Sequence, residues 1–117
     1  MLNFEGRNIY LACGSTDLRK SMNGLSVLVA AQFQMSPFED NIFVFCNKSR
    51  TAIKILEWDS NGFWLFHKKL DRGHFNWPSA ADRRPMELTA DELQMMLDGT
   101  KLIQKLKRQQ IKPLNAC

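Results

Sequence analysis

The segment from residue 41 to 78 constrains the fold of this chain more than any other. It reads NIFVFCNKSRTAIKILEWDSNGFWLFHKKLDRGHFNWP. Three strand-length runs rich in Ile, Val, Phe and Trp, at 41–46, 51–58 and 63–70, are separated by turn-forming residues. The second turn contains Asn61-Gly62, the strongest short-range hairpin signal, because both residues tolerate the positive φ of a tight turn. The segment therefore predicts a three-stranded antiparallel meander.

Hairpin pairing divides the side chains of the last two runs between two faces, because successive strand residues point in opposite directions. The division is the same for a second loop of two or of four residues. One face carries Lys54, Leu56, Trp58, Phe63, Leu65 and His67, and the other carries Ile53, Ile55, Glu57, Trp64, Phe66 and Lys68. Both faces include apolar side chains, and one helix covers only one of them. The other face must be covered by another part of the chain or by a partner.

Two further elements are predicted before the meander. Residues 8–12 (NIYLA) form a short strand candidate that ends before Gly14. A helix is then expected over 16–34, with Ser15 or Thr16 as N-cap and Asp17 in the first turn. The three- and four-residue spacing of its apolar stripe supports this helix, and the stripe is Leu18, Met22, Leu25, Val29 and Phe33.

The segment after the meander, 71–88, is predicted to be irregular. A last helix begins at Thr89, because Thr89 and Glu92 have the spacing of a capping box and Leu88 and Leu93 occupy the flanking staple positions. The sequence leaves two ends open for this helix, one at Asp98-Gly99 and one near Gln110.

These elements predict an α+β fold: a small, mostly antiparallel sheet, made of the meander and a candidate N-terminal strand, packed with an N-terminal helix and a C-terminal helix. The chain has 117 residues, about one domain's worth. We assign 1–99 to a single domain and 100–117 to a basic C-terminal helix or tail. Five basic residues and no acidic ones lie between Lys101 and Lys112.

Composition excludes several classes of protein. Hydrophobic residues make up 44% and charged residues 24%, as is ordinary for soluble globular proteins. The N-terminus lacks the pattern of a signal peptide, and no apolar run approaches the roughly 20 residues that cross a bilayer. The three cysteines have no metal-binding or redox spacing. A cytoplasmic protein without a membrane partner is expected, and its formal net charge of +4 is compatible with nucleic acid.

The sequence offers no catalytic centre, no metal site and no cofactor site. Phosphoryl transfer on Mg²⁺ needs several converging carboxylates, and Glu57 is the only acid placed within a predicted strand. Asp17 and Asp59 are better explained by helix and turn chemistry. His67, His74 and Cys46 fit no ligand spacing, and the Gly14-Ser15-Thr16 region lacks the lysine of a phosphate loop.

A run of residues across most of the chain, from about Asn8 to Leu97, is similar to one family in order and spacing. It includes Asp17-Leu18-Arg19-Lys20-Ser21, Phe43-Val44-Phe45-Cys46-Asn47, Lys54-Ile55-Leu56, Trp58-Asp59, Gly62-Phe63-Trp64, Lys69-Leu70, Arg72-Gly73, Phe75 and Trp77-Pro78. The chain resembles the small TnpB-type accessory proteins of insertion sequences of the IS-sixty-six group, which are distinct from the RNA-guided nucleases of the same label. Asn23-Gly24 and Glu39-Asp40 depart from the family pattern. The resemblance implies a role in transposition beside a separate transposase, and it supplies no catalytic residues.

The candidate nucleic-acid or partner-binding residues are basic or aromatic. They are Arg19, Lys20, Lys48, Arg50, Lys54, Lys68, Lys69, Arg72, Trp64 and Trp77. The basic members either form a solvated set that discourages edge pairing, or line a surface that faces DNA or transposase. Phe43, Phe45, Trp58 and Phe63 are expected in the core, with Leu56 and Trp58 against Leu25 and Val29, whereas Trp64 and Trp77 are expected to be exposed.

We therefore predict a non-enzymatic accessory factor for DNA transposition that acts with an element-encoded transposase, through DNA contacts, transposase contacts or both. A nucleic-acid-binding regulator that acts independently of the transposase is the alternative. A cryptic nuclease subunit is a third interpretation.

Overall fold

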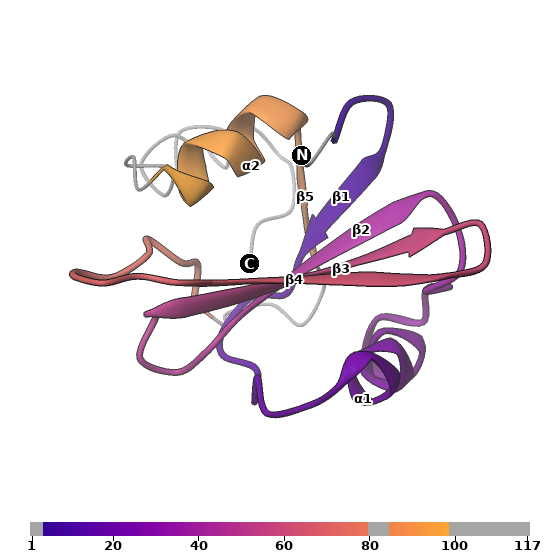
Figure 1. The fold of residues 1–117 in the computed structure, drawn as a ribbon, viewed down its shortest axis with the longest axis horizontal. Coiled ribbons are helices and arrows are strands. Elements are labelled where there is room, and N and C mark those ends of the chain that lie inside the picture. Colours follow the sequence, from indigo (N-terminus) through magenta and orange to yellow (C-terminus); the bar gives the residue numbers. More distant parts are fainter. Residues whose placement is uncertain (1–3, 80–84, 99–117) are drawn as a thin grey trace.

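A single five-stranded sheet organises the protein, with one helix on each face (Figure 1). The structure is a computed structural model, and it describes residues 4–79 and 85–98. Along the chain, the elements are β1 (Asn8–Leu11), α1 (Met22–Leu28), the π-helix η1 (Val29–Phe33), β2 (Asn41–Cys46), β3 (Ala52–Asp59), β4 (Gly62–Lys69), β5 (Met86–Leu88) and α2 (Ala90–Leu97). The strand order is β4-β3-β2-β1-β5. The predicted α+β fold is confirmed.

The meander forms as predicted, and its register confirms both predicted faces. β2 pairs antiparallel with β3, and β3 with β4. Leu56 lies opposite Leu65 on one face, and Ile55 lies opposite Phe66 on the other. The N-terminal strand β1 is also present and runs parallel to β2, because the intervening helical segment returns the chain to the same end of the sheet.

Two details of the sheet differ from the predictions. β5 pairs antiparallel with β1 inside the segment that was expected to be irregular. Only three residues form it, so it has too few positions to show alternation in the sequence. The hairpin between β3 and β4 is tight, but Ser60 adopts the positive φ of 53°, while Gly62 already belongs to β4.

The first helix begins later than predicted. Its N-cap is Ser21, and the segment before it is extended and turned. The backbone N–H of Thr16 donates to the carbonyl of Cys46 (2.7 Å), and the Asp17 carboxylate accepts the backbone N–H of Arg19 (3.0 Å). A short acidic side chain that bonds its own turn competes with helix formation, so the assignment of Ser15 or Thr16 as cap and Asp17 as first-turn residue is wrong.

The sheet separates two hydrophobic cores, and all six residues of β2 between them are buried. Leu25 and Val29 pack with Phe43, Phe45 and Leu56 on the α1 face, as predicted. On the other face, Leu93, Met96 and Leu97 of α2 pack over a core that includes Ile53 and Ile55. The second apolar face is thus covered by the chain itself.

The prediction that Trp58 belongs to the buried core is wrong. It is only half-buried, and so is its cross-strand neighbour Phe63. The Trp58 ring makes edge contacts with Phe38 (centroids 5.1 Å apart) and Phe63 (5.0 Å). The three rings form a cluster beside the core, near the turn end of β3. Phe38, which contacts both other rings, is itself 56% exposed, so the cluster remains in contact with solvent.

The last helix carries the predicted capping box. Thr89 accepts the backbone N–H of Glu92, and the Glu92 carboxylate accepts the backbone N–H of Thr89. The helix ends at Leu97 with Asp98 as C-cap, and the predicted basic segment 100–117 lies outside the described residues. Over the described ranges, no helix has both the length and the apolar character to span a membrane.

Candidate nucleic-acid or partner interface

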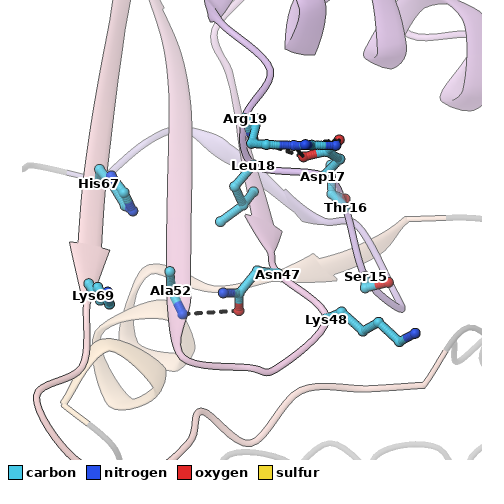
Figure 2. A pocket seen from close by; sticks show the side chains of 10 residues that line it. All are labelled: Ser15, Thr16, Asp17, Leu18, Arg19, Asn47, Lys48, Ala52, His67 and Lys69. Atoms are coloured by element: carbon cyan, nitrogen blue, oxygen red, sulfur yellow. Dashed lines mark hydrogen bonds and ion pairs between the residues drawn. The ribbon is translucent and has the colours of Figure 1, made fainter.

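A groove of about 580 Å³ lies at the end of the sheet where β2 turns into β3, on the α1 side (Figure 2). Three segments meet there: the chain before α1, the β2–β3 turn and the C-terminal end of β4. The lining residues are Ser15, Thr16, Asp17, Leu18, Arg19, Asn47, Lys48, Ala52, His67 and Lys69. The groove thus collects three predicted binding residues, Arg19, Lys48 and Lys69, from distant parts of the sequence.

Asn47 determines the shape of the β2–β3 turn. Its side-chain oxygen accepts the backbone N–H groups of Thr51 (2.9 Å) and Ala52 (3.1 Å), and the second bond is visible in Figure 2. Arg50 closes the turn with a positive φ of 60°. These constraints leave the side chains of Lys48 and Arg50 exposed to solvent on a defined turn.

Asp17 and Arg19 form a local ion pair on the groove wall (Figure 2). The guanidinium donates to both carboxylate oxygens, at 2.8 to 3.2 Å. Hydrogen bonds from the Arg19 side chain and backbone lower the pKa of Asp17 from 3.8 to about 2, and the same pair raises the pKa of Arg19. Because Asp17 offsets the charge of Arg19, the positive charge of the groove comes from Lys48 and Lys69, which have no ion-pair partner among the described residues.

A second, smaller groove of about 220 Å³ continues from the first and shares Ser15, Asn47 and Lys48 with it. Arg50 and Trp77 also line it. The loop that carries Arg72 is held beside this turn, since Leu70 N–H donates to the carbonyl of Thr51 (2.8 Å) and Phe75 N–H to that of Arg50 (2.7 Å). Arg72 itself is fully exposed. Lys69, Lys48 and Arg50 therefore line two connected grooves, and we call this set the groove cations.

The other predicted binding residues lie elsewhere or have structural partners. Lys68 is on the opposite face, where its ammonium donates to the carbonyl of Leu97 at the end of α2. Lys54 donates to the backbone carbonyl of Lys20 (3.3 Å), and so holds the turn before α1. The side chain of Lys20 is exposed but does not line either groove.

The two tryptophan predictions have different outcomes. Trp64 is 54% exposed, as predicted, and its indole N–H donates to Asp59 (2.9 Å). The prediction for Trp77 is wrong: it is only 5% exposed, and its indole N–H donates to the carbonyl of Ala12 (3.0 Å). An aromatic residue in an irregular loop has no periodicity to reveal its burial, and here the loop folds back over the sheet.

Seven lining residues of the first groove are not among the predicted binding residues, and four of these seven carry hydroxyl, amide or imidazole groups. The sequence predicts only a helix cap for Ser15 and Thr16, a turn for Asn47 and a sheet face for His67. The alternation of β4 does put His67 on the same side as Lys69, which is the one sequence signal that connects it with the groove.

The acidic side chains of the meander have structural partners. Glu57 forms an ion pair with Arg7 (2.7 Å), and Asp59 accepts the indole N–H of Trp64. The thiol of Cys46 is fully buried, and burial raises its pKa to about 12. No group of three or more His, Cys, Asp or Glu residues within 4–79 and 85–98 is placed to hold a metal ion. This geometry offers cations and hydroxyls for binding an anion.

Comparison with known proteins places the chain in a family. Residues 7–107 match the family model described as IS66 Orf2 like protein. The chain is 34% identical over 97 residues to the uncharacterized protein y4hO of Sinorhizobium fredii (strain NBRC 101917 / NGR234), which covers 81% of this chain and 84% of that protein. It is 30% identical over 95 residues to the uncharacterized protein y4jC of the same organism, which covers 81% of this chain and 80% of that protein. No solved structure matches the chain. The protein is therefore a member of the IS66 Orf2-like family, a family associated with insertion sequences.

Proposed function

We propose that this protein is a non-enzymatic accessory factor for DNA transposition, which acts with the transposase of its insertion sequence and contacts DNA phosphates through the groove cations. Family membership supports the link to an insertion sequence. The observation that carries the DNA contact is the convergence of Lys48 from the β2–β3 turn and Lys69 from β4 on one groove. Neither lysine forms an ion pair within the described residues, and the carboxylate in the groove, Asp17, is paired with Arg19.

The chemistry of the groove suits a phosphate backbone. Two lysine ammonium groups supply point charges, and the hydroxyls of Ser15 and Thr16 add hydrogen-bond donors at the same wall. Phosphate contacts of this kind position a protein on DNA without reading its sequence. Recognition of the element ends would then belong to the transposase.

A role without catalysis fits the contacts of Asp17, Glu57 and Asp59, which bond other side chains instead of converging on one point. Phosphoryl transfer would need carboxylates that converge on metal ions. Asp17 and Glu57 instead pair with Arg19 and Arg7, and Asp59 bonds the indole of Trp64. The decisive check is incubation of the purified protein with element-end DNA and Mg²⁺ or Mn²⁺, in which no cleavage is expected.

A salt titration of DNA affinity tests the phosphate contacts. For the full chain, log K should fall linearly with log salt, by about 0.9 per phosphate neutralised. The double change Lys48→Gln/Lys69→Gln should flatten that slope by up to about two units and weaken binding similarly for all sequences. The control Lys20→Gln/Lys68→Gln removes the same charge outside the grooves, and it should change the slope less.

A transposase pull-down on the same variants separates the remaining interpretations. Loss of complex formation with unchanged DNA affinity would show that the grooves face the transposase. DNA binding that depends on the groove cations, without any transposase complex, would favour the regulator that acts alone. If neither assay responds to Lys48→Gln/Lys69→Gln, the grooves are solvated surface and the proposed contact is wrong.

A further inference from the structure

Within residues 4–79 and 85–98, no strand pairs with the outer edge of β4. β4 has eight residues and lies at one end of the strand order, with β3 as its single neighbour in the described part of the chain. The opposite edge, β5, has only three residues. A long edge strand presents a row of backbone donors and acceptors to any strand that approaches it.

The tight hairpin determines which residues offer those backbone groups. Asp59 and Gly62 flank the two-residue turn, so their backbone groups bond each other across β3 and β4. The carbonyl and N–H groups of Gly62 and of every second residue after it therefore point to β3. Those of Phe63, Leu65, His67 and Lys69 point outward, to the free edge.

The side chains along this edge are apolar over the first half of the strand. Trp64 is 54% exposed, and its ring stacks on that of Phe66 with centroids 6.0 Å apart and planes 15° apart. Phe63, Leu65 and Phe66 are only half-buried. The charges that commonly protect edge strands occur only at the far end, as Lys68 and Lys69.

This distribution of charge selects the direction in which two such strands can pair. A parallel arrangement would set the lysines of one copy beside the same lysines of the other. An antiparallel arrangement sends the Lys68-Lys69 end of each copy to the turn of the other, where Asp59 lies, and brings the apolar halves together.

We propose that β4 pairs antiparallel with β4 of a second copy, around a twofold axis that passes near Leu65 perpendicular to the sheet. Leu65 then faces Leu65 of the second copy, and Trp64 faces Phe66. The pairing uses the outward backbone groups of Phe63, Leu65 and His67, and it joins the two five-stranded sheets into one.

The dimer has a consequence for the grooves. A twofold axis perpendicular to the sheet keeps both α1 helices, and so both grooves, on the same side. Each Lys69 lies four residues from the axis, so the two are separated by roughly 27 Å along the strands at the usual rise per residue. One face of the dimer would present two basic grooves, whether their ligand is DNA or the transposase.

Sedimentation equilibrium of the full chain tests the pairing without DNA. A species of twice the 13.5 kDa chain mass is expected. Trp64→Lys should weaken the dimer by roughly tenfold or more, because it replaces an aromatic cross-strand contact with a charge. Val27→Lys is the matched control, since Val27 is 65% exposed on α1 and remote from β4, and it should leave the dimer unchanged.

A proline substitution tests the backbone itself. The N–H of His67 points outward, so His67→Pro should abolish the dimer but keep the pairing with β3, and its thermal transition should remain cooperative. If His67→Pro does not fold, Trp64→Lys still decides the question. A monomeric wild-type chain, or a dimer that neither change weakens, would overturn the proposal. The single change Lys48→Gln, on the β2–β3 turn and not on β4, should dimerise normally but flatten the salt dependence of DNA affinity, which separates this pairing from the proposed phosphate contact.

Discussion

At the scale of single residues, Asp17 shows how the wall of the groove is built. Its carboxylate accepts the backbone N–H and the guanidinium of Arg19, two residues later. The turn this creates prevents the helix from beginning at Thr16 and aligns the segment 15–19 along the groove. The ion pair is exposed, so its role is to shape a turn and to balance the charge of Arg19 rather than to stabilise the whole fold.

The acid titration of Asp17 tests this local role. In the folded protein its pKa is expected at about 2, below the ordinary 3.8, because Arg19 donates to its charged form. The stabilisation of the turn is therefore complete above the ordinary pKa and is lost as pH falls toward 2. Carboxyl chemical shifts measured by NMR should give this midpoint, and Arg19→Gln should return it toward 3.8. A midpoint near 3.8 in the wild type would mean that the pair does not form in solution.

At the scale of elements, the N-terminus of α2 is capped more completely than that of α1. α2 has a complete capping box at Thr89, and Lys68 donates to the carbonyl of Leu97 at its other end. α1 has a single, longer bond from Gly24 N–H to the Ser21 hydroxyl (3.5 Å). α2 can therefore remain helical with only eight residues, because both ends satisfy backbone groups that are otherwise unpaired.

Removal of the two helix caps should lower the free energy of unfolding by different amounts. Thr89→Ala should lower the free energy of unfolding by about 1 kcal/mol, because it leaves the N–H of Glu92 without its acceptor. Ser21→Ala is the control at the other helix, and it should cost less, since its bond is long and exposed. Urea unfolding followed by tryptophan fluorescence measures both. Equal losses would contradict the difference between the caps.

At the scale of the whole molecule, β2 is the centre of the protein, buried between the α1 core and the α2 core. The α1 core is the smaller, and it depends on Leu56, which is fully buried and packs with Leu25 and Val29. Trp58 lies on the same face but only in the peripheral ring cluster.

The loss of unfolding free energy on truncation of Leu56 and of Trp58 should follow how deeply each side chain is buried rather than how large it is. Leu56→Ala should cost about 2–5 kcal/mol, because it opens a cavity between α1 and the sheet. Trp58→Ala should cost less, although it removes a larger side chain, because Trp58 already contacts solvent. Denaturant midpoints compared at equal slope give the two values. A greater loss for Trp58→Ala would contradict the half-buried position of its ring.

Local patterns in the sequence were sufficient for the meander, its two faces and the cap of α2. Strand alternation and the Thr89–Glu92 spacing are properties of neighbouring residues, so they can be read without knowledge of the fold. The same patterns separated Leu56 from Ile55 and placed them correctly in different cores.

Only the tertiary structure decided the rest. The three residues of β5 form a strand because β1 offers an edge, and Trp77 is buried because its indole reaches the carbonyl of Ala12, 65 residues away. The groove is likewise made from segments that are distant in the chain, so no periodicity could have joined Lys48 to Lys69, although strand alternation does separate Lys69 from Lys68. Contacts between distant residues depend on how the elements pack against one another, and the local periodicity of the sequence does not determine that packing.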